Sequence, residues 1–180
     1  MVGRLLVATS QLTDPNFAKT VILLLSHDDD GALGVVLDQP TEVRVADVLP
    51  AWGEVLTEPD VLFHGGPVGA DSALGLVSLH VDEEPPGVRR VTEELGLVDL
   101  DAPVEVVEPG VSQMRVFAGY AGWGKGQLEE EIDEGAWFLL DMCDGDVFGR
   151  GDQDLWRVVL RRQNSDLSLL STMPEDPTAN

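Results

Sequence analysis

The chain has 180 residues, a length that favours one domain with a core large enough to hold without disulfide bonds. Its 33 Asp and Glu outnumber its 11 Lys and Arg, so the formal net charge is −22. Such an acidic chain repels polyphosphate, which argues against direct nucleic-acid binding, and its single cysteine excludes an internal disulfide bond.

The apolar runs of the chain are short. The longest, Val21 to Leu25, is far too short to span a bilayer. The residues before Asp14 lack the long apolar stretch and the small-residue cleavage site of a secretory signal. Together with the lone Cys143, these features predict a soluble cytoplasmic protein that makes no membrane contact.

The first half of the chain predicts strands joined by tight turns. Leu5 to Ala8 is typical of a short strand. The runs Val21 to Ser26 and Ala32 to Leu37 predict a hairpin with Asp and Gly in its turn. Both runs are apolar without alternation, which indicates a sheet covered on both faces. Helical spacing of apolar residues predicts a short helix from Val43 to Leu49, and a strand is expected over Val61 to Phe63.

The second half adds further strands and two amphipathic helices. Strands are expected over residues 74–81, 88–91, 96–100, 113–119 and 136–142, whereas residues 104–111 fit either type of element. Helices are predicted over Gln127–Glu134 and Asp152–Arg162, with Asp152 as the N-cap of the second. Pro174–Asn180 is a polar tail. The pattern predicts one α+β domain over residues 1–180 with a mixed, largely antiparallel sheet flanked by helices.

The segment from residue 115 to 137 is unusually rich in glycine. Four glycines lie within eight residues: Gly119, Gly122, Gly124 and Gly126. Tyr120 and Trp123 flank the pair Ala121-Gly122. Glycine at this density marks a backbone with unusual dihedral angles, or one that approaches something closely. The sequence predicts a tight loop between a strand and a helix.

Four ordered blocks resemble the YqgE/AlgH family of bacterial proteins. They are GRLLVATSQLTDPNFAKTVILLLSHDDDGALGVVLDQP (3–40), HGGPV (64–68), FAGYAGWGKGQLEEEIDEGAW (117–137) and VFGRGDQDLWRVVL (147–160). Asp38 departs from the pattern, because the family tends to carry Asn before its Pro. The resemblance implies a compact α+β fold with a partly barrel-like sheet and no established biochemical activity. A member named for an effect on alginate production implies a regulatory role linked to transcription.

Two glycine-containing segments are candidates for a ligand site. The turn HGGPV and the glycine-rich loop each follow an apolar strand, so both turns can lie at the same edge of a sheet. Exposed amides in such turns can bind an anion. The alternative is that both are structural turns in which glycine avoids a clash. The candidate residues are His64, Gly65, Gly66, Pro67, Gly119, Tyr120, Gly122 and Trp123.

The glycine-rich loop also comes close to a phosphate-binding motif. Gly119, four residues, Gly124 and Lys125 match G-x-x-x-x-G-K, but Gly126 stands where Ser or Thr would ligate Mg²⁺. The glutamates at 129–131 would repel a phosphate at the start of the following helix. The sequence therefore predicts no nucleotide site.

The remaining reactive side chains form no recognisable set. His27 precedes three aspartates, but the loop lacks the spacing of a Ca²⁺ site, and the histidines lack the spacing of a zinc motif. No G-x-S-x-G motif is present. We expect no catalytic residues, no metal and no cofactor.

Two functions remain open from the sequence. The first is a non-enzymatic regulatory or binding protein of the YqgE/AlgH type, acting on transcription indirectly. The second is an enzyme or small-ligand protein that uses a pocket between HGGPV and GYAGWGKG. The partner is an unidentified protein or small molecule, and a homo-oligomer is compatible with either function.

Overall fold

The computed structural model describes residues 1–80, 84–149 and 154–163. Asp152 and the tail from Pro174 to Asn180 lie outside these residues. Ten strands form one hydrogen-bonded sheet that curls into a half-barrel and divides into two sections, which we name sheet A and sheet B. The fold is the α+β fold with a largely antiparallel, partly barrel-like sheet that the sequence and the family resemblance predict.

Sheet A contains the strands that the apolar runs predict. Its strands are β1 (Leu5–Ala8), β2 (Val21–Asp28), β3 (Gly31–Val36), β10 (Trp137–Leu140) and the end of β9 (Val111–Gly124). They lie in the order β10-β1-β2-β3-β9, and each pairs antiparallel with its neighbour. All four residues of β1 are fully buried, as a strand covered on both faces requires.

Sheet B contains strands of very different lengths and several single-turn helices. Its strands are β4 (Pro40–Arg44), β5 (Val61–His64), β6 (Val68–Leu79), β7 (Val88–Arg90), β8 (Leu95–Val98) and the first part of β9. The helices are α1 (Val45–Val48), η1 (Pro50–Trp52), α2 (Val104–Val107) and η2 (Glu108–Gly110). The segment 104–111, which fits either element by sequence, is therefore helical up to Gly110.

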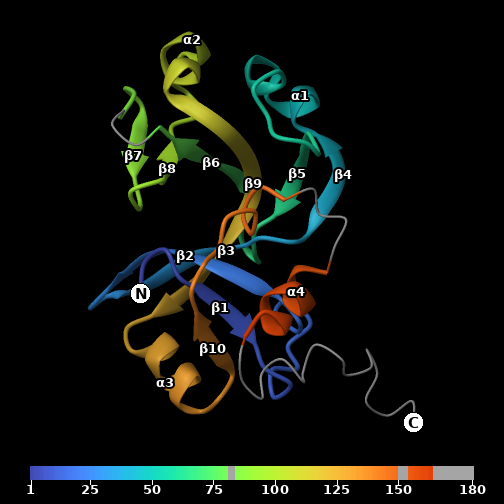
Figure 1. Cartoon of the computed structure of the whole chain (residues 1–180), viewed down its shortest axis with the longest axis vertical. Helices are drawn as coiled ribbons and strands as arrows, with labels where there is room; N and C mark the ends of the chain where they lie inside the picture. Colours follow the sequence, from blue (N-terminus) through green and yellow to red (C-terminus); the bar gives the residue numbers. More distant parts are fainter. Residues whose placement is uncertain (81–83, 150–153, 164–180) are drawn as a thin grey trace.

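Strand β9 belongs to both sheets. Residues up to Tyr120 pair with β6 in sheet B, whereas Ala121 to Gly124 pair with β3 in sheet A. In Figure 1, β9 descends through the centre of the molecule and joins the upper and lower parts. The prediction of a glycine loop after Gly119 is wrong, because the strand continues through Gly124. The loop before the next helix is only Lys125 and Gly126.

Three apolar clusters form the core. One lies between the sheets and includes Leu23, Phe63, Phe117 and Trp156. A second packs the other face of sheet A against α3 (Gln127–Asp133). The third fills the curl of sheet B under α1 and α2.

Helix α4 (Leu155–Arg161) covers the edge of the cluster between the sheets. The side chain of Asp154 accepts a hydrogen bond from the Arg157 amide and caps this helix. The N-cap is therefore Asp154 and not Asp152, which changes the predicted start of the helix by two residues. Among the described residues, no helix combines the length and the apolar content needed to cross a membrane.

Candidate functional site

Strands β5 and β9 bring the two glycine-containing segments into contact. Phe63 and His64 pair in parallel with Phe117 and Ala118. The Gly65 amide then donates a hydrogen bond of 2.8 Å to the Ala118 carbonyl, and the Gly65 carbonyl accepts one of 2.9 Å from the Val36 amide. The HGGPV turn therefore crosses β9 at the point where β9 passes from one sheet to the other.

The crossing brings backbone against backbone. A methyl group added to Gly65 or Gly66 would lie closer than 3.0 Å to the backbone of Gly119 or Tyr120. One added to Gly119 would come equally close to the carbonyl oxygen of Gly66. Gly66 and Gly119 also have φ angles of 151° and 77°, a region that side chains disfavour. Both glycines are therefore required by the close contact and by the backbone conformation.

The two aromatic residues of the glycine-rich segment face opposite sides of the sheet. Tyr120 packs against the cluster between the sheets, with its ring near Gly69. Trp123 lies in the cluster below sheet A, and its ring is nearly perpendicular to that of Trp137 at a centroid distance of 6.2 Å. Residues three apart in a strand project to opposite faces. Tyr120 and Trp123 therefore do not line one shared pocket.

The other candidate residues lie at the edge of this junction. His64 is half-buried at the end of β5, and its amide donates a hydrogen bond of 2.8 Å to the Gln39 carbonyl. Pro67 and Gly122 are exposed. Of the eight candidates, Gly66 lies against the backbone of Tyr120 and Gly65 against that of Gly119, whereas Trp123 packs in a separate cluster below sheet A.

In the segment that resembles a phosphate-binding loop, one backbone amide is already hydrogen-bonded within the chain. The Gly124 amide donates to the Gln127 side-chain oxygen at 3.0 Å, so this amide does not point to a free space for phosphate. Lys125 is exposed, and Gly126 has open space around it. Glu129 and Glu130 lie in the first turn of α3. A phosphate at this helix start would be repelled by these carboxylates.

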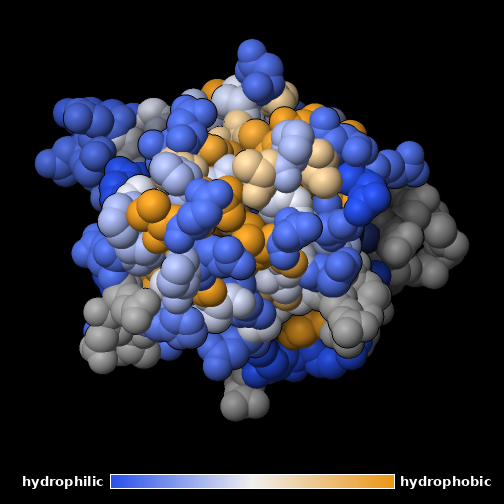
Figure 2. All heavy atoms as spheres, turned by 90° about the horizontal axis from the view of Figure 1, so that it is seen from above, coloured by the Kyte–Doolittle hydropathy of each residue, from blue (hydrophilic) through white to orange (hydrophobic). Residues whose placement is uncertain are grey.

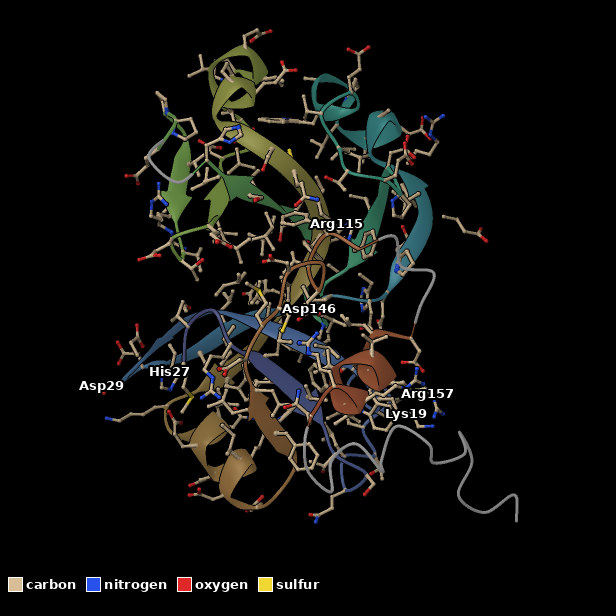
Figure 3. The ribbon with its side chains drawn as sticks, in the orientation of Figure 1. Lys19, His27, Asp29, Arg115, Asp146 and Arg157 are labelled. Carbon is tan, nitrogen blue, oxygen red and sulfur yellow. The ribbon has the colours of Figure 1, made fainter. Side chains whose placement is uncertain are left out.

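A hydrogen bond between His27 and Glu129, next to the acidic turn at residues 28–30, was not anticipated from the sequence. The His27 side chain lies 2.5 Å from the Glu129 carboxylate, which joins β2 to α3 (Figure 3). The hydrogen bond from His27 lowers the pKa of Glu129. Asp28 accepts a hydrogen bond from the Asp30 amide, so the acidic turn is stabilised locally. No group of His, Cys, Asp and Glu among the described residues is arranged to hold a metal ion.

Arg115 is a buried cation at the centre of the molecule (Figure 3). Its guanidinium donates hydrogen bonds to the carbonyls of Val147, at 2.7 Å, and Glu58, at 3.0 Å. It also lies 4.3 Å from the centre of the Phe63 ring. Burial lowers the pKa of Arg115 to about 10. This side chain fixes two irregular segments to β9.

Asp146 helps to hold the segment that follows β10, which Arg115 also contacts through Val147. Its carboxylate accepts two hydrogen bonds of 2.7 Å from Arg162 at the end of α4, and a third from the Cys143 amide. The hydrogen bonds to Asp146 raise the pKa of Arg162. Arg115 and Asp146 together hold the segment that follows β10 between the two sheets. No spacing in the sequence predicts the contacts of Arg115 or the pairing of Asp146 with Arg162, because these partners are far apart along the chain.

Asp38 carries a carboxyl group whose charged form is disfavoured by burial. Its Oδ1 atom is buried and has no hydrogen-bond partner among the described residues. Burial raises the pKa of Asp38 to about 6, and the charge of Asp154 acts in the same direction. Backbone hydrogen bonds at Asp38 and Val21 oppose the rise. The departure from Asn at this position is the one sequence signal that points to it.

Comparison with known proteins identifies the family. Residues 5–168 match the DUF179 family, which is described as AlgH-like. The chain belongs to the AlgH-like family. It is 52% identical over 184 residues to a UPF0301 protein of Streptomyces coelicolor, with 100% of this chain and 95% of that protein covered. It is 45% identical over 181 residues to a UPF0301 protein of Mycobacterium tuberculosis, with 99% and 90% covered.

Two solved structures share the fold of this AlgH-like chain. The crystal structure of a Corynebacterium diphtheriae protein superposes with a TM-score of 0.90 at 36% identity, covering 96% of this chain and 92% of that one. The solution structure of the AlgH protein from Pseudomonas aeruginosa gives a TM-score of 0.71 at 26% identity, with 97% and 94% covered. The family resemblance deduced from the four blocks is confirmed.

The contact of Gly65 and Gly66 with Gly119 and Tyr120 is named the glycine junction. Two cavities of the AlgH-like chain lie away from it. One, of about 420 Å³, is open between sheet B and the segment after β10. The other, of about 120 Å³, lies between η1 and η2, and five of its six lining residues are apolar. Neither is lined by HGGPV or by residues 119–124. The sequence did not indicate the second cavity, because its walls come from segments about 50 residues apart.

Proposed function

We propose that this AlgH-like chain is a non-enzymatic, cytoplasmic binding protein that acts in regulation by contacting another protein. One observation carries the proposal: the glycine junction is closed by direct backbone contact between Gly66 and Tyr120. The segment that the sequence favours most as a ligand site is thus filled by the chain itself. Gly65, Gly66 and Gly119 have a structural reason that needs no ligand.

The charge of the chain supports an indirect link to transcription. The three C-terminal arginines are the densest basic group in the sequence, but Arg162 pairs with Asp146 and Arg157 with Asp154. Arg115 is buried. Duplex DNA binding depends on exposed cations that replace condensed counterions, and a net charge of −22 opposes approach. Contact with a protein of the transcription apparatus or of another pathway does not require the chain to approach the DNA phosphates.

The alternative, a small ligand held between HGGPV and GYAGWGKG, receives less support. A ligand there would have to separate Gly66 from Tyr120 and break the hydrogen bond from Gly65 to Ala118. The two aromatic residues that would line such a pocket belong to different clusters. The residues His64, Gly65, Gly66, Pro67, Gly119, Tyr120, Gly122 and Trp123 are therefore proposed as a structural junction.

Cross-linking in the native cell tests the proposal. The full chain, carrying a photoreactive residue at an exposed position, should form a discrete adduct with one protein and leave DNA unlabelled. A fluorescence anisotropy titration with duplex DNA at low salt is the second arm. Submicromolar DNA binding that weakens steeply with salt would contradict the indirect link. Turnover of a substrate by the purified chain would contradict the non-enzymatic function.

A further inference from the structure

The end of sheet B carries apolar side chains on its surface. Val48 of α1 is 52% exposed, Val43 of β4 is 45% exposed and Val106 of α2 is 43% exposed. Figure 2 looks down on this end of the molecule and shows hydrophobic residues grouped among hydrophilic ones. Exposed apolar groups that gather on one face are typical of a binding surface, whereas single ones are ordinary.

The cavity of about 120 Å³ between η1 and η2 opens at the same end. Its walls are formed by Trp52, Val55, Val107, Glu108, Val111 and Met114. Trp52, Val107 and Met114 are almost fully buried, and the Trp52 indole donates a hydrogen bond of 2.9 Å to the Leu100 carbonyl. The floor is therefore fixed in place. A pocket of this size with five apolar residues among its six lining residues suits one inserted aliphatic side chain of a partner.

The segments around the pocket are uniformly acidic. Residues 45–58 and 99–111 contain seven Asp and Glu and no Lys, Arg or His. Asp47, Glu54, Glu105 and Glu108 are exposed. The neighbouring Arg44 is paired with Asp60 at 3.0 Å. His80 is also nearby, since its amide donates to the Gly110 carbonyl, but it directly follows β6 and lies outside the two acidic segments.

We infer that this surface, the α1–α2 surface, docks a cationic segment of a partner protein. The inference rests on the proposed binding function and names its site. One aliphatic side chain of the segment enters the pocket over Trp52, and Lys or Arg on either side face Glu105 and Glu108. Charge selects this occupant: a second copy of the chain, a nucleic acid and an anionic membrane are all repelled by the carboxylates.

An NMR titration of the folded full chain with designed peptides tests the inference. The probe is a short peptide with one central Leu among Lys and Arg. A second peptide has Ser in place of Leu, and a third has Glu in place of the basic residues. The basic Leu peptide should saturate the chain at low salt and shift the Trp52 indole and the methyl groups of Val107 and Met114. The other two should bind at least about tenfold more weakly, since each lacks one of the two contacts.

A pair of charge variants separates a local site from general attraction. Glu105→Lys with Glu108→Lys reverses two charges at the pocket. Asp29→Lys with Asp30→Lys makes the same charge change at the exposed β2–β3 turn, away from the α1–α2 surface. The first double variant should weaken the peptide by about tenfold or more, and the second should alter binding little. Val55→Phe, which narrows the pocket, should weaken the Leu peptide and leave the Ser peptide unchanged.

The outcomes distinguish this inference from the proposed function. Equal losses in the two double variants would show that only net charge attracts the peptide and would overturn the α1–α2 surface. Shifts confined to other residues, or no saturable binding, would do the same. A specific cross-linked partner would still support the proposed function in those cases. Thermal melting of each variant confirms that the fold is retained before its binding is compared.

Discussion

Gly66 and Tyr120 lie backbone against backbone, closer than a methyl group on Gly66 would permit. This contact places the HGGPV turn over β9 at the point where that strand leaves sheet B and enters sheet A. It explains Gly65 and Gly66 of one segment and Gly119 of the other by one cause. Each of these three needs to be glycine because the other segment occupies the space where a side chain would lie.

Substitution at this contact should be far more costly than substitution nearby. Gly66→Ala adds a methyl group at a φ of 151° against the Tyr120 backbone, which cannot move without breaking the sheet. We expect a loss of about 3 kcal/mol or more in the free energy of unfolding. Gly122→Ala is the control, because its nearest neighbour is the Tyr120 ring at 3.6 Å, and it should change stability by less than about 1 kcal/mol. Urea denaturation of both variants is the measurement, and equal midpoints would contradict the structural function of Gly66.

Trp156 should contribute through both packing and hydrogen bonding. The side chain is 3% exposed, and its indole donates a hydrogen bond of 2.7 Å to the Ala8 carbonyl. Trp156→Ala should cost about 3–5 kcal/mol, whereas Trp156→Phe should cost about 1–3 kcal/mol because a buried carbonyl loses its partner. Trp137→Ala should resemble the first variant, since Trp137 is equally buried. Val48→Ala, at an exposed site, is the control. Unchanged thermal midpoints for both tryptophan variants would refute the prediction.

Asp38 should make the protein less stable as the pH rises. Its pKa is raised from 3.8 to about 6 in the folded chain, so folding disfavours the charged form. The cost is absent below pH 3.8, grows between pH 3.8 and about 6, and is constant above that range. Asp38→Asn should therefore stabilise the chain by about 1–3 kcal/mol at pH 7.5 and by almost nothing at about pH 3.5. Asp29→Asn, at an exposed turn, is the control in a denaturation series over pH. A gain that does not depend on pH would exclude the ionisation of Asp38 as its cause.

The chain should not bind or hydrolyse ATP or GTP. Gly126 offers no side chain to Mg²⁺, the Gly124 amide is bonded to Gln127, and two glutamates lie at the start of α3. Calorimetry with Mg-ATP and Mg-GTP should show no saturable heat. Lys125→Ala should give the same result as the natural chain. Micromolar binding that this substitution abolishes would identify a working phosphate loop.

The elements that sequence patterns predicted correctly share one property. Their signal is local, as in the apolar runs of β2 and β3 or the spacing of Leu128 and Ile132 in α3. The glycine-rich part of β9 has the composition of a loop, because dense glycine marks both a loop and a strand crossed by another backbone. No pattern in the sequence indicates the buried contacts of Arg115 or the pocket over Trp52. Their partners, such as Glu58 and Val147, are brought near only by the completed fold.

The pairing of β1 with β10 has a consequence for synthesis of the chain. Leu5 lies opposite Leu140, so the first strand cannot acquire this neighbour until nearly four-fifths of the chain has left the ribosome. Closing so long a loop is entropically unfavourable and slow. Until then β1 can pair only with β2, and its other edge is a row of unpaired backbone N–H and C=O groups on an apolar strand. Nascent chains truncated before Trp137 should therefore depend on chaperones, which a release experiment with stalled ribosomes can measure.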